Sequence, residues 1–224
     1  MECSELARHY DVLLFDLDGT LSDSKAGIIN SIQYALEKFH ITEDDHSKLQ
    51  RFIGPPLLES FRTSYQFDEF KAKQAVEYYR EYYSTKGIYE GILYDGIPDL
   101  LRKLYRKKKM LIVATSKPTP YARRVLNHFA LDKFFTSIVG SHLDGTRSSK
   151  KEVIECIVSD LTQVSKRHVV MIGDRDHDVR GAHANGIDSI AVTYGYGALE
   201  EIENAGPTYI VNSVHELSLK LDEC

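Results

Sequence analysis

Two aspartates separated by a single residue end the first apolar run of the chain. The run VLLF at 12–15 leads into DLDGT at 16–20, which contains Asp16 and Asp18. Side chains two positions apart point to the same side of an extended backbone, so both carboxylates face one crevice. Such a pair repels itself unless a cation or a shared proton intervenes. Because oxygen ligands suit Mg²⁺, the pattern predicts a magnesium site here.

A hydroxyl and an ammonium group follow the second apolar run, LIVAT at 111–115. Ser116 offers an O–H that can donate to a phosphoryl oxygen, and Lys117 adds positive charge beside it. Another cation, Lys150, stands where a polar loop enters a predicted helix. These groups predict a site for a phosphate-bearing anion.

A second acidic segment, GDRDHD at 173–178, follows another apolar run. Asp174 comes directly after that run and is placed to complete a metal site with Asp16. Asp178 is placed to ligate or support the site from the following turn. For Arg175 and His177, contact with substrate and a purely structural role both stay open.

The elements that must position these residues are short apolar runs rich in Val and Ile, with helical patterns between them. Runs of this kind are typical of strands buried on both faces of a parallel sheet. Their alternation with helices predicts a doubly wound, Rossmann-like α/β fold, in which ligands bind at the carboxyl ends of the strands. The predicted strands cover 12–15, 111–115, 137–140, 169–173, 189–193 and 209–211.

A long interval separates the first two predicted strands and holds more helical pattern than one crossover needs. Apolar residues recur at helical intervals in 26–39 and again in 67–84. The economical explanation is a helical insert, so we predict a cap at 24–88 and a catalytic core formed by 1–23 and 89–224.

DLDGT, the serine after the second strand, a lysine near 150 and GDRDHD follow one another in an order that resembles the haloacid dehalogenase superfamily. Within it the chain looks most like phosphoglycolate phosphatases and related small-substrate phosphatases. The resemblance implies that Asp16 attacks phosphorus and forms an aspartyl phosphate, while Asp18 acts as acid and base. It implies a Mg²⁺ ion and a helical cap over the site. The implied metal ligands are Asp16, Asp18, Asp174 and Asp178, the phosphate contacts Thr20, Ser116, Lys117 and Lys150, and the substrate-selecting cap loop Gly54, Pro55 and Pro56.

Bulk properties fit an ordinary globular protein of 224 residues, with a net charge of −5 that gives no support to a nucleic-acid partner. No run of apolar residues is long enough to span a membrane, so we expect no membrane partner. The cysteines Cys3, Cys156 and Cys224 lie far apart, which favours reduced thiols and a cytoplasmic location. We expect a monomer or a homodimer.

Several alternatives stay open at this point. Phosphoglycolate, a nucleoside monophosphate and a sugar phosphate all suit the predicted chemistry, and a phosphomutase would use the same carboxylate pair. Phosphonate hydrolysis would need a cap lysine such as Lys25, Lys38 or Lys48 as a Schiff base. A regulatory protein that kept the fold without activity is the non-enzymatic alternative. The glycine-rich segment YGYG at 194–197 has no assigned role.

Overall fold

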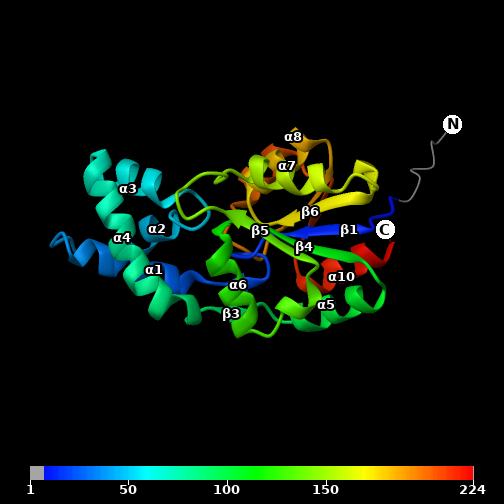
Figure 1. The fold of residues 1–224 in the computed structure, drawn as a ribbon, viewed down its shortest axis with the longest axis horizontal. Helices are drawn as coiled ribbons and strands as arrows, with labels where there is room; N and C mark the ends of the chain where they lie inside the picture. The colour runs from blue at the N-terminus through cyan, green and yellow to red at the C-terminus, as the bar shows by residue number, and fades with distance from the viewer. Residues whose placement is uncertain (1–7, 224) are drawn as a thin grey trace.

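A six-stranded parallel sheet forms the centre of the protein in the computed structural model, which describes residues 8–223 (Figure 1). The strand order is β5-β4-β1-β6-β7-β8, so the first strand lies inside the sheet with the motif-bearing strands β4 and β6 as its neighbours. This confirms the doubly wound α/β prediction. The strands are β1 (Val12–Phe15), β4 (Met110–Pro118), β5 (Ser137–Ser141), β6 (Val169–Gly173), β7 (Asp188–Val192) and β8 (Tyr209–Val211).

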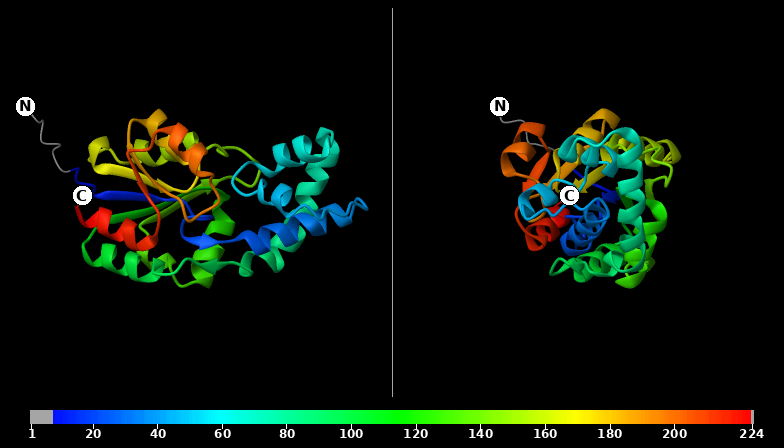
Figure 2. Two further views of the ribbon diagram at one scale, coloured as in Figure 1. Left: turned by 180° about the vertical axis from the view of Figure 1, so that it is seen from behind. Right: turned by 90° about the vertical axis from the view of Figure 1, so that its left-hand side faces the viewer.

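Helices cover both faces of the sheet because the strands are apolar on both sides. In β1, Leu13 and Phe15 pack into one hydrophobic cluster, whereas Val12 and Leu14 pack into another. Figures 1 and 2 show α7 and α8 over one face and α5, α6 and α10 over the other. The helices of the core are α5 (Ile97–Arg106), α6 (Thr119–His128), α7 (Lys150–Asp160), α8 (Asp176–Asn185), α9 (Leu199–Ala205) and α10 (Val214–Glu223).

Strand register brings the motif residues to one level at the carboxyl edge of the sheet. Phe15 lies opposite Val113 on one side and opposite Ile172 on the other. The next residue, Asp16, continues the ladder, since its N–H donates to the carbonyl of Ile172 at 2.9 Å. Residues that follow β1, β4 and β6 therefore emerge together, as parallel strands require.

A helical cap lies beyond this edge, between the first two strands of the sheet in sequence (Figures 1 and 2). The chain enters it through β2 (Ser22–Asp23) and leaves through β3 (Ile92–Leu93), and these two short strands pair antiparallel. Helix α1 packs on α4, which confirms the two helical patterns predicted there. The cap helices are α1 (Lys25–Glu37), α2 (His46–Gln50), α3 (Leu57–Tyr65) and α4 (Glu69–Thr85).

Aromatic rings form much of the interior of the cap. Phe61 lies between Phe52, with ring centroids 5.1 Å apart, and Phe67, at 6.2 Å. In the tyrosine-rich stretch of α4, Tyr79 and Tyr83 are buried and stack on each other at 5.3 Å. Because the two rings are buried and stacked, this part of α4 belongs to the packed interior of the protein.

Over residues 8–223, no helix combines the length and the apolar character that a membrane crossing requires. Cys156 is a free thiol. Cys3 and Cys224 lie outside the described residues.

Candidate active site

A buried lysine joins two buried carboxylates at the carboxyl edge of the sheet. Lys150 is the first residue of α7, where Ser149 forms a capping box with Glu152. Its Nζ lies 2.8 Å from Oδ1 of Asp16 and 2.9 Å from Oδ1 of Asp178. Burial alone lowers the pKa of Lys150, but the two carboxylates outweigh it and raise that pKa above its ordinary value. The two carboxylates therefore favour the charged ammonium, which forms an ion pair with the nucleophile candidate.

The Nζ atom of Lys150 also donates to the backbone carbonyl of Ala114 at 2.9 Å, so it connects β1, β4 and α8. Its neighbour Lys151 is exposed. Of these two adjacent lysines, Lys150 is therefore the one whose side chain reaches the carboxylates.

Asp174 is fully buried directly after β6. Its Oδ1 accepts from the hydroxyl of Thr20 at 3.2 Å, and its Oδ2 accepts from the N–H of Tyr196 at 2.7 Å. Burial raises the pKa of Asp174 well above the usual range, and the charges of Asp178 and Asp16 raise it further. Thr20, which we predicted to contact phosphate, donates its O–H to Asp174 in this structure.

The donor set fits a divalent cation. Asp16, Asp174 and Asp178 are 6 %, 0 % and 1 % exposed, and Lys150 offsets only part of their negative charge. Burial raises the pKa of Asp16 even against the attraction of Lys150, so its charge lacks full compensation. Asp16, His177 and Asp178 each offer a ligand atom within 4.8 Å of the others. Hard oxygen donors with surplus negative charge suit Mg²⁺.

His177 belongs to this group although we did not predict it as a ligand. Asp174, which we did predict as a ligand, is not among these three residues, and its two carboxylate oxygens accept hydrogen bonds from Thr20 and Tyr196. The spacing of GDRDHD gives some signal for His177, since it lies in the first turn of α8 beside Asp178.

A second lysine connects the core to the cap. The Nζ of Lys117, near the end of β4, lies 2.7 Å from Oδ1 of Asp18 and donates to the hydroxyl of Tyr83 at 2.5 Å. The ammonium also lies 4.9 Å from the centre of the Tyr83 ring. Lys117 is therefore placed to meet a bound anion while it holds Asp18 and α4 at the same site.

Two neighbouring hydroxyl residues line the cavity at the end of β4. Ser116 borders the cavity, and its carbonyl accepts from the hydroxyl of Ser141 at 2.8 Å. Thr115 also borders the cavity but is buried, and its hydroxyl accepts from the N–H of Lys117 at 3.2 Å. Thr115 is a phosphate-contact candidate that the motifs did not indicate, although it closes the apolar run 111–115 from which the strand was predicted.

The predicted cap loop, Gly54, Pro55 and Pro56, borders the same cavity. Arg175 holds it there, since its Nη1 donates to the carbonyl of Ile53 at 2.9 Å while its Nε donates to Glu201 at 3.0 Å. Gly54 has a φ of 107°, and a Cβ on it would lie 3.2 Å from the ring of His177. The loop therefore rests on the core close to the acidic group.

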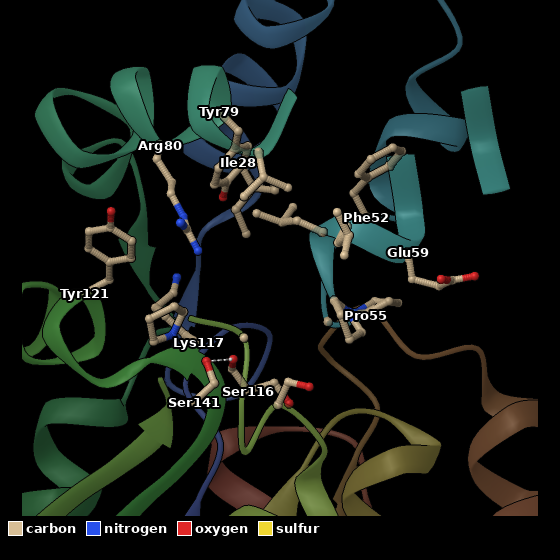
Figure 3. A pocket seen from close by; sticks show the side chains of 18 of the residues that line it. Ile28, Phe52, Pro55, Glu59, Tyr79, Arg80, Ser116, Lys117, Tyr121 and Ser141 are labelled. Atoms are coloured by element: carbon tan, nitrogen blue, oxygen red, sulfur yellow. Dashed lines mark hydrogen bonds between the residues drawn. The ribbon is translucent and has the colours of Figure 1, made fainter. Parts of the chain in front are cut away.

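The cavity between cap and core has a volume of about 820 Å³ (Figure 3). Asp16, Asp18 and Lys117 lie at its core end. In Figure 3, Arg80 extends from the cap towards Lys117, and its Nη2 donates to the carbonyl of Leu143 at 2.7 Å. We name four rings that line the cavity the aromatic wall: Phe52, Tyr79, Tyr83 and Tyr121.

Comparison with known proteins agrees with this geometry. The profile of the family described as haloacid dehalogenase-like hydrolase matches residues 13–192. A 5'-nucleotidase of Pseudomonas aeruginosa is 46% identical over 205 residues, covering 92% of this chain and 92% of that protein. The tyrosine-protein kinase PtkA of Mycobacterium bovis is 38% identical, covering 90% of this chain and 68% of that protein.

Among solved structures, a predicted phosphatase from Clostridium acetobutylicum superposes with a TM-score of 0.91. It is 49% identical and covers 96% of this chain and 100% of its own. The similarity therefore spans cap and core together.

Proposed function

Because this chain belongs to the haloacid dehalogenase-like hydrolases and is a phosphoric monoester hydrolase, we propose that it hydrolyses nucleoside monophosphates with Mg²⁺, through an aspartyl phosphate on Asp16. The observation that carries the proposal is the joining of Asp16 to Lys150 beneath a large aromatic cavity. The assignment of Asp16, Asp18 and Asp174 to the reaction is part of this proposal.

In the first step a carboxylate oxygen of Asp16 bonds to phosphorus while the bond from phosphorus to the ester oxygen breaks. Asp18 gives its proton to the departing oxygen. In the second step Asp18 takes a proton from water, whose oxygen attacks phosphorus and releases Asp16. Asp18 is suited to both roles because it lines the cavity and its side chain is 15% exposed.

Positive charge must offset the repulsion between the Asp16 carboxylate and a phosphate. At an effective dielectric of about 20, two unit charges about 4 Å apart interact by roughly 4 kcal/mol. Lys150 supplies one compensating charge beside Asp16, and Lys117 supplies another beside Asp18. A Mg²⁺ ion held by Asp16, Asp178 and either Asp174 or His177, with the carbonyl of Asp18, would neutralise further charge on the phosphoryl oxygens.

The size and lining of the cavity favour a nucleotide over a smaller ester. Pockets for small molecules span about 300–1,000 Å³, and this cavity of about 820 Å³ lies in the upper part of that range. A two-carbon ester such as phosphoglycolate would leave most of it unfilled. Of the aromatic wall, Tyr121 is only partly buried, so its ring can meet a nucleobase, which stacks on tyrosine and phenylalanine rings. The name of the Pseudomonas relative supports the same substrate class.

The test is a Mg²⁺-dependent screen of nucleoside monophosphates, sugar phosphates and phosphoglycolate, measuring phosphate release. We expect nucleotides to be the best substrates and Asp16→Asn to lower turnover by at least about a thousandfold, with an unchanged circular dichroism spectrum. Asp160→Asn, an exposed aspartate at the end of α7, is the matched control. Full turnover by Asp16→Asn contradicts the mechanism, and isomerised sugar phosphate without release indicates a phosphomutase.

A further inference from the structure

The glycine-rich segment 194–197 follows β7 and lies between Asp174 and β2, the strand through which the chain enters the cap and which we call the hinge strand. Its glycines allow the backbone to come very close to Asp174. A Cβ on Gly195 would lie 2.3 Å from Cβ of Asp174, and one on Gly197 would lie 2.0 Å from its carbonyl oxygen. Only glycine fits at these two positions without a shift of the backbone.

Tyr196, between the two glycines, contacts the acidic site through its main chain. Its N–H donates to Oδ2 of Asp174 at 2.7 Å. This is a hydrogen bond from a neutral donor to a carboxylate in a buried place, where such bonds are strong. The orientation of the Asp174 carboxylate therefore depends on where the backbone of Tyr196 lies.

The phenol of the same residue contacts the entrance to the cap. Its O–H donates to Oδ1 of Asp23 at 2.8 Å, and its oxygen accepts from the N–H of Ser24 at 2.8 Å. Asp23 ends the hinge strand β2, and Ser24 directly precedes α1. Oδ1 of Asp23 also accepts from the N–H of Lys25 at 3.0 Å, so the phenol holds the first turn of the cap.

We infer that Tyr196 is a positioning residue that connects the first linker of the cap to the carboxylate of Asp174. The N–H of Tyr196 binds Asp174, and its phenol binds the linker at Asp23 and Ser24. Displacement of the linker therefore moves the N–H that donates to Asp174. The position of the cap and the geometry of the acidic site are thereby linked. This inference rests on the proposed function, because it assigns Asp174 to the metal site.

The test compares Tyr196→Phe with Tyr10→Phe. Tyr10, at the other end of the sheet, also donates its O–H to an aspartate, Asp188, at 2.8 Å, so both variants lose the same kind of bond. We expect Tyr196→Phe to lower kcat/KM by about tenfold and to weaken Mg²⁺ binding, measured by calorimetry on the substrate-free protein, by about threefold. Tyr10→Phe should lower the unfolding temperature and leave both quantities unchanged.

A second variant distinguishes loss of the link between linker and Asp174 from a general loss of stability. Asp23→Ala removes the phenol's acceptor and leaves Tyr196 intact, and the double variant should lose much less than the product of the two single losses. If Tyr196→Phe changes only the unfolding temperature, as Tyr10→Phe does, the inference is overturned. If the wild-type protein releases no phosphate from any ester yet the variants differ in Mg²⁺ affinity, the proposed function fails and the linkage stands.

Discussion

The acidic floor of the site and the aromatic wall above it are built in opposite ways. The floor consists of Asp16, Lys150, Asp174 and Asp178, all buried charged groups that come from the ends of strands or the starts of helices. The wall consists of Phe52, Tyr79, Tyr83 and Tyr121. Tyr83 contacts both Tyr79 and Tyr121, and Phe52 packs on Phe61 inside the cap. The floor is thus defined by the positions of its buried ionisable groups, and the wall by the shape that its packed rings give to the cavity.

This difference teaches which property of the enzyme each region controls. In the proposed mechanism, charges on the floor act on phosphorus, which every phosphate ester shares, so changes there should affect all substrates alike. In the same proposal the rings of the wall contact the rest of the substrate, so changes there should affect substrates unequally. Lys117 lies between the two regions, since it holds Asp18 and Tyr83 at once.

The largest expected effect is on the floor, at Lys150. Lys150→Met leaves Asp16 and Asp178 buried without their counter-ion, so we expect the free energy of unfolding to fall by about 3–5 kcal/mol and activity to vanish for every ester. Urea unfolding without Mg²⁺ measures the stability. The exposed neighbour variant Lys151→Met should stay within about 0.5 kcal/mol of wild type. Equal losses in both variants would contradict the ion-pair role of Lys150.

Asp174→Asn should separate activity from stability on the same floor. Loss of a metal ligand should lower kcat/KM by about a hundredfold or more for all substrates. Burial raises the pKa of Asp174, so its ionised form costs folding free energy, and stability falls as pH rises above the unfolded pKa of about 3.9. The neutral amide removes that cost.

Thermal unfolding without Mg²⁺ tests this second effect. Asp174→Asn should be more stable than wild type at mildly alkaline pH, the gap should close on acidification, and added Mg²⁺ should raise the unfolding temperature of wild type more than that of the variant. Asp160→Asn should show no such pattern. A variant that is less stable than wild type at every pH would show that the hydrogen bonds of Asp174 outweigh its burial.

The smallest expected effect belongs to the wall. Tyr121→Ala removes a ring that lines the cavity and meets Tyr83 edge to face at 5.6 Å. We expect KM for nucleotides to rise about fivefold, with kcat and the KM for sugar phosphates little changed. Tyr105→Ala, an exposed ring on α5, is the control. Equal losses for all esters in steady-state kinetics would mean that the wall does not select substrates.

Most of the floor could be predicted from sequence because its residues lie directly after buried parallel strands or at the starts of the helices that follow them. Once 12–15, 111–115 and 169–173 are buried parallel strands, the residues after them must meet at one edge. Asp16, Lys150 and Asp178 do meet there, and their chemical roles stay predictions. The six predicted strands and the fold class are confirmed.

The position of the wall above the core could not be predicted because the contacts that fix it, such as those of Tyr83 with Tyr121 and Lys117, join residues far apart in sequence. Nothing in the periodicity of α4 shows that Tyr83 meets Lys117, or that Arg175 reaches the carbonyl of Ile53. Helical spacing shows which residues share a face, but it does not show which ring faces which partner across a domain boundary. The role of Tyr196 depends on the same kind of long-range contact.

The pairing of β2 with β3 makes the cap an insertion whose two ends are neighbours. Ser22 lies opposite Leu93 and Asp23 opposite Ile92, so residues 24–91 form, in topological terms, one long hairpin loop. The cost of closing a loop grows only slowly with its length, and the sheet keeps its strand order whatever the loop contains. The topology therefore lets the same core carry caps of different length and composition, but a replacement cap would also have to supply partners for Lys117, Arg175 and Tyr196, which contact the present cap and its linker.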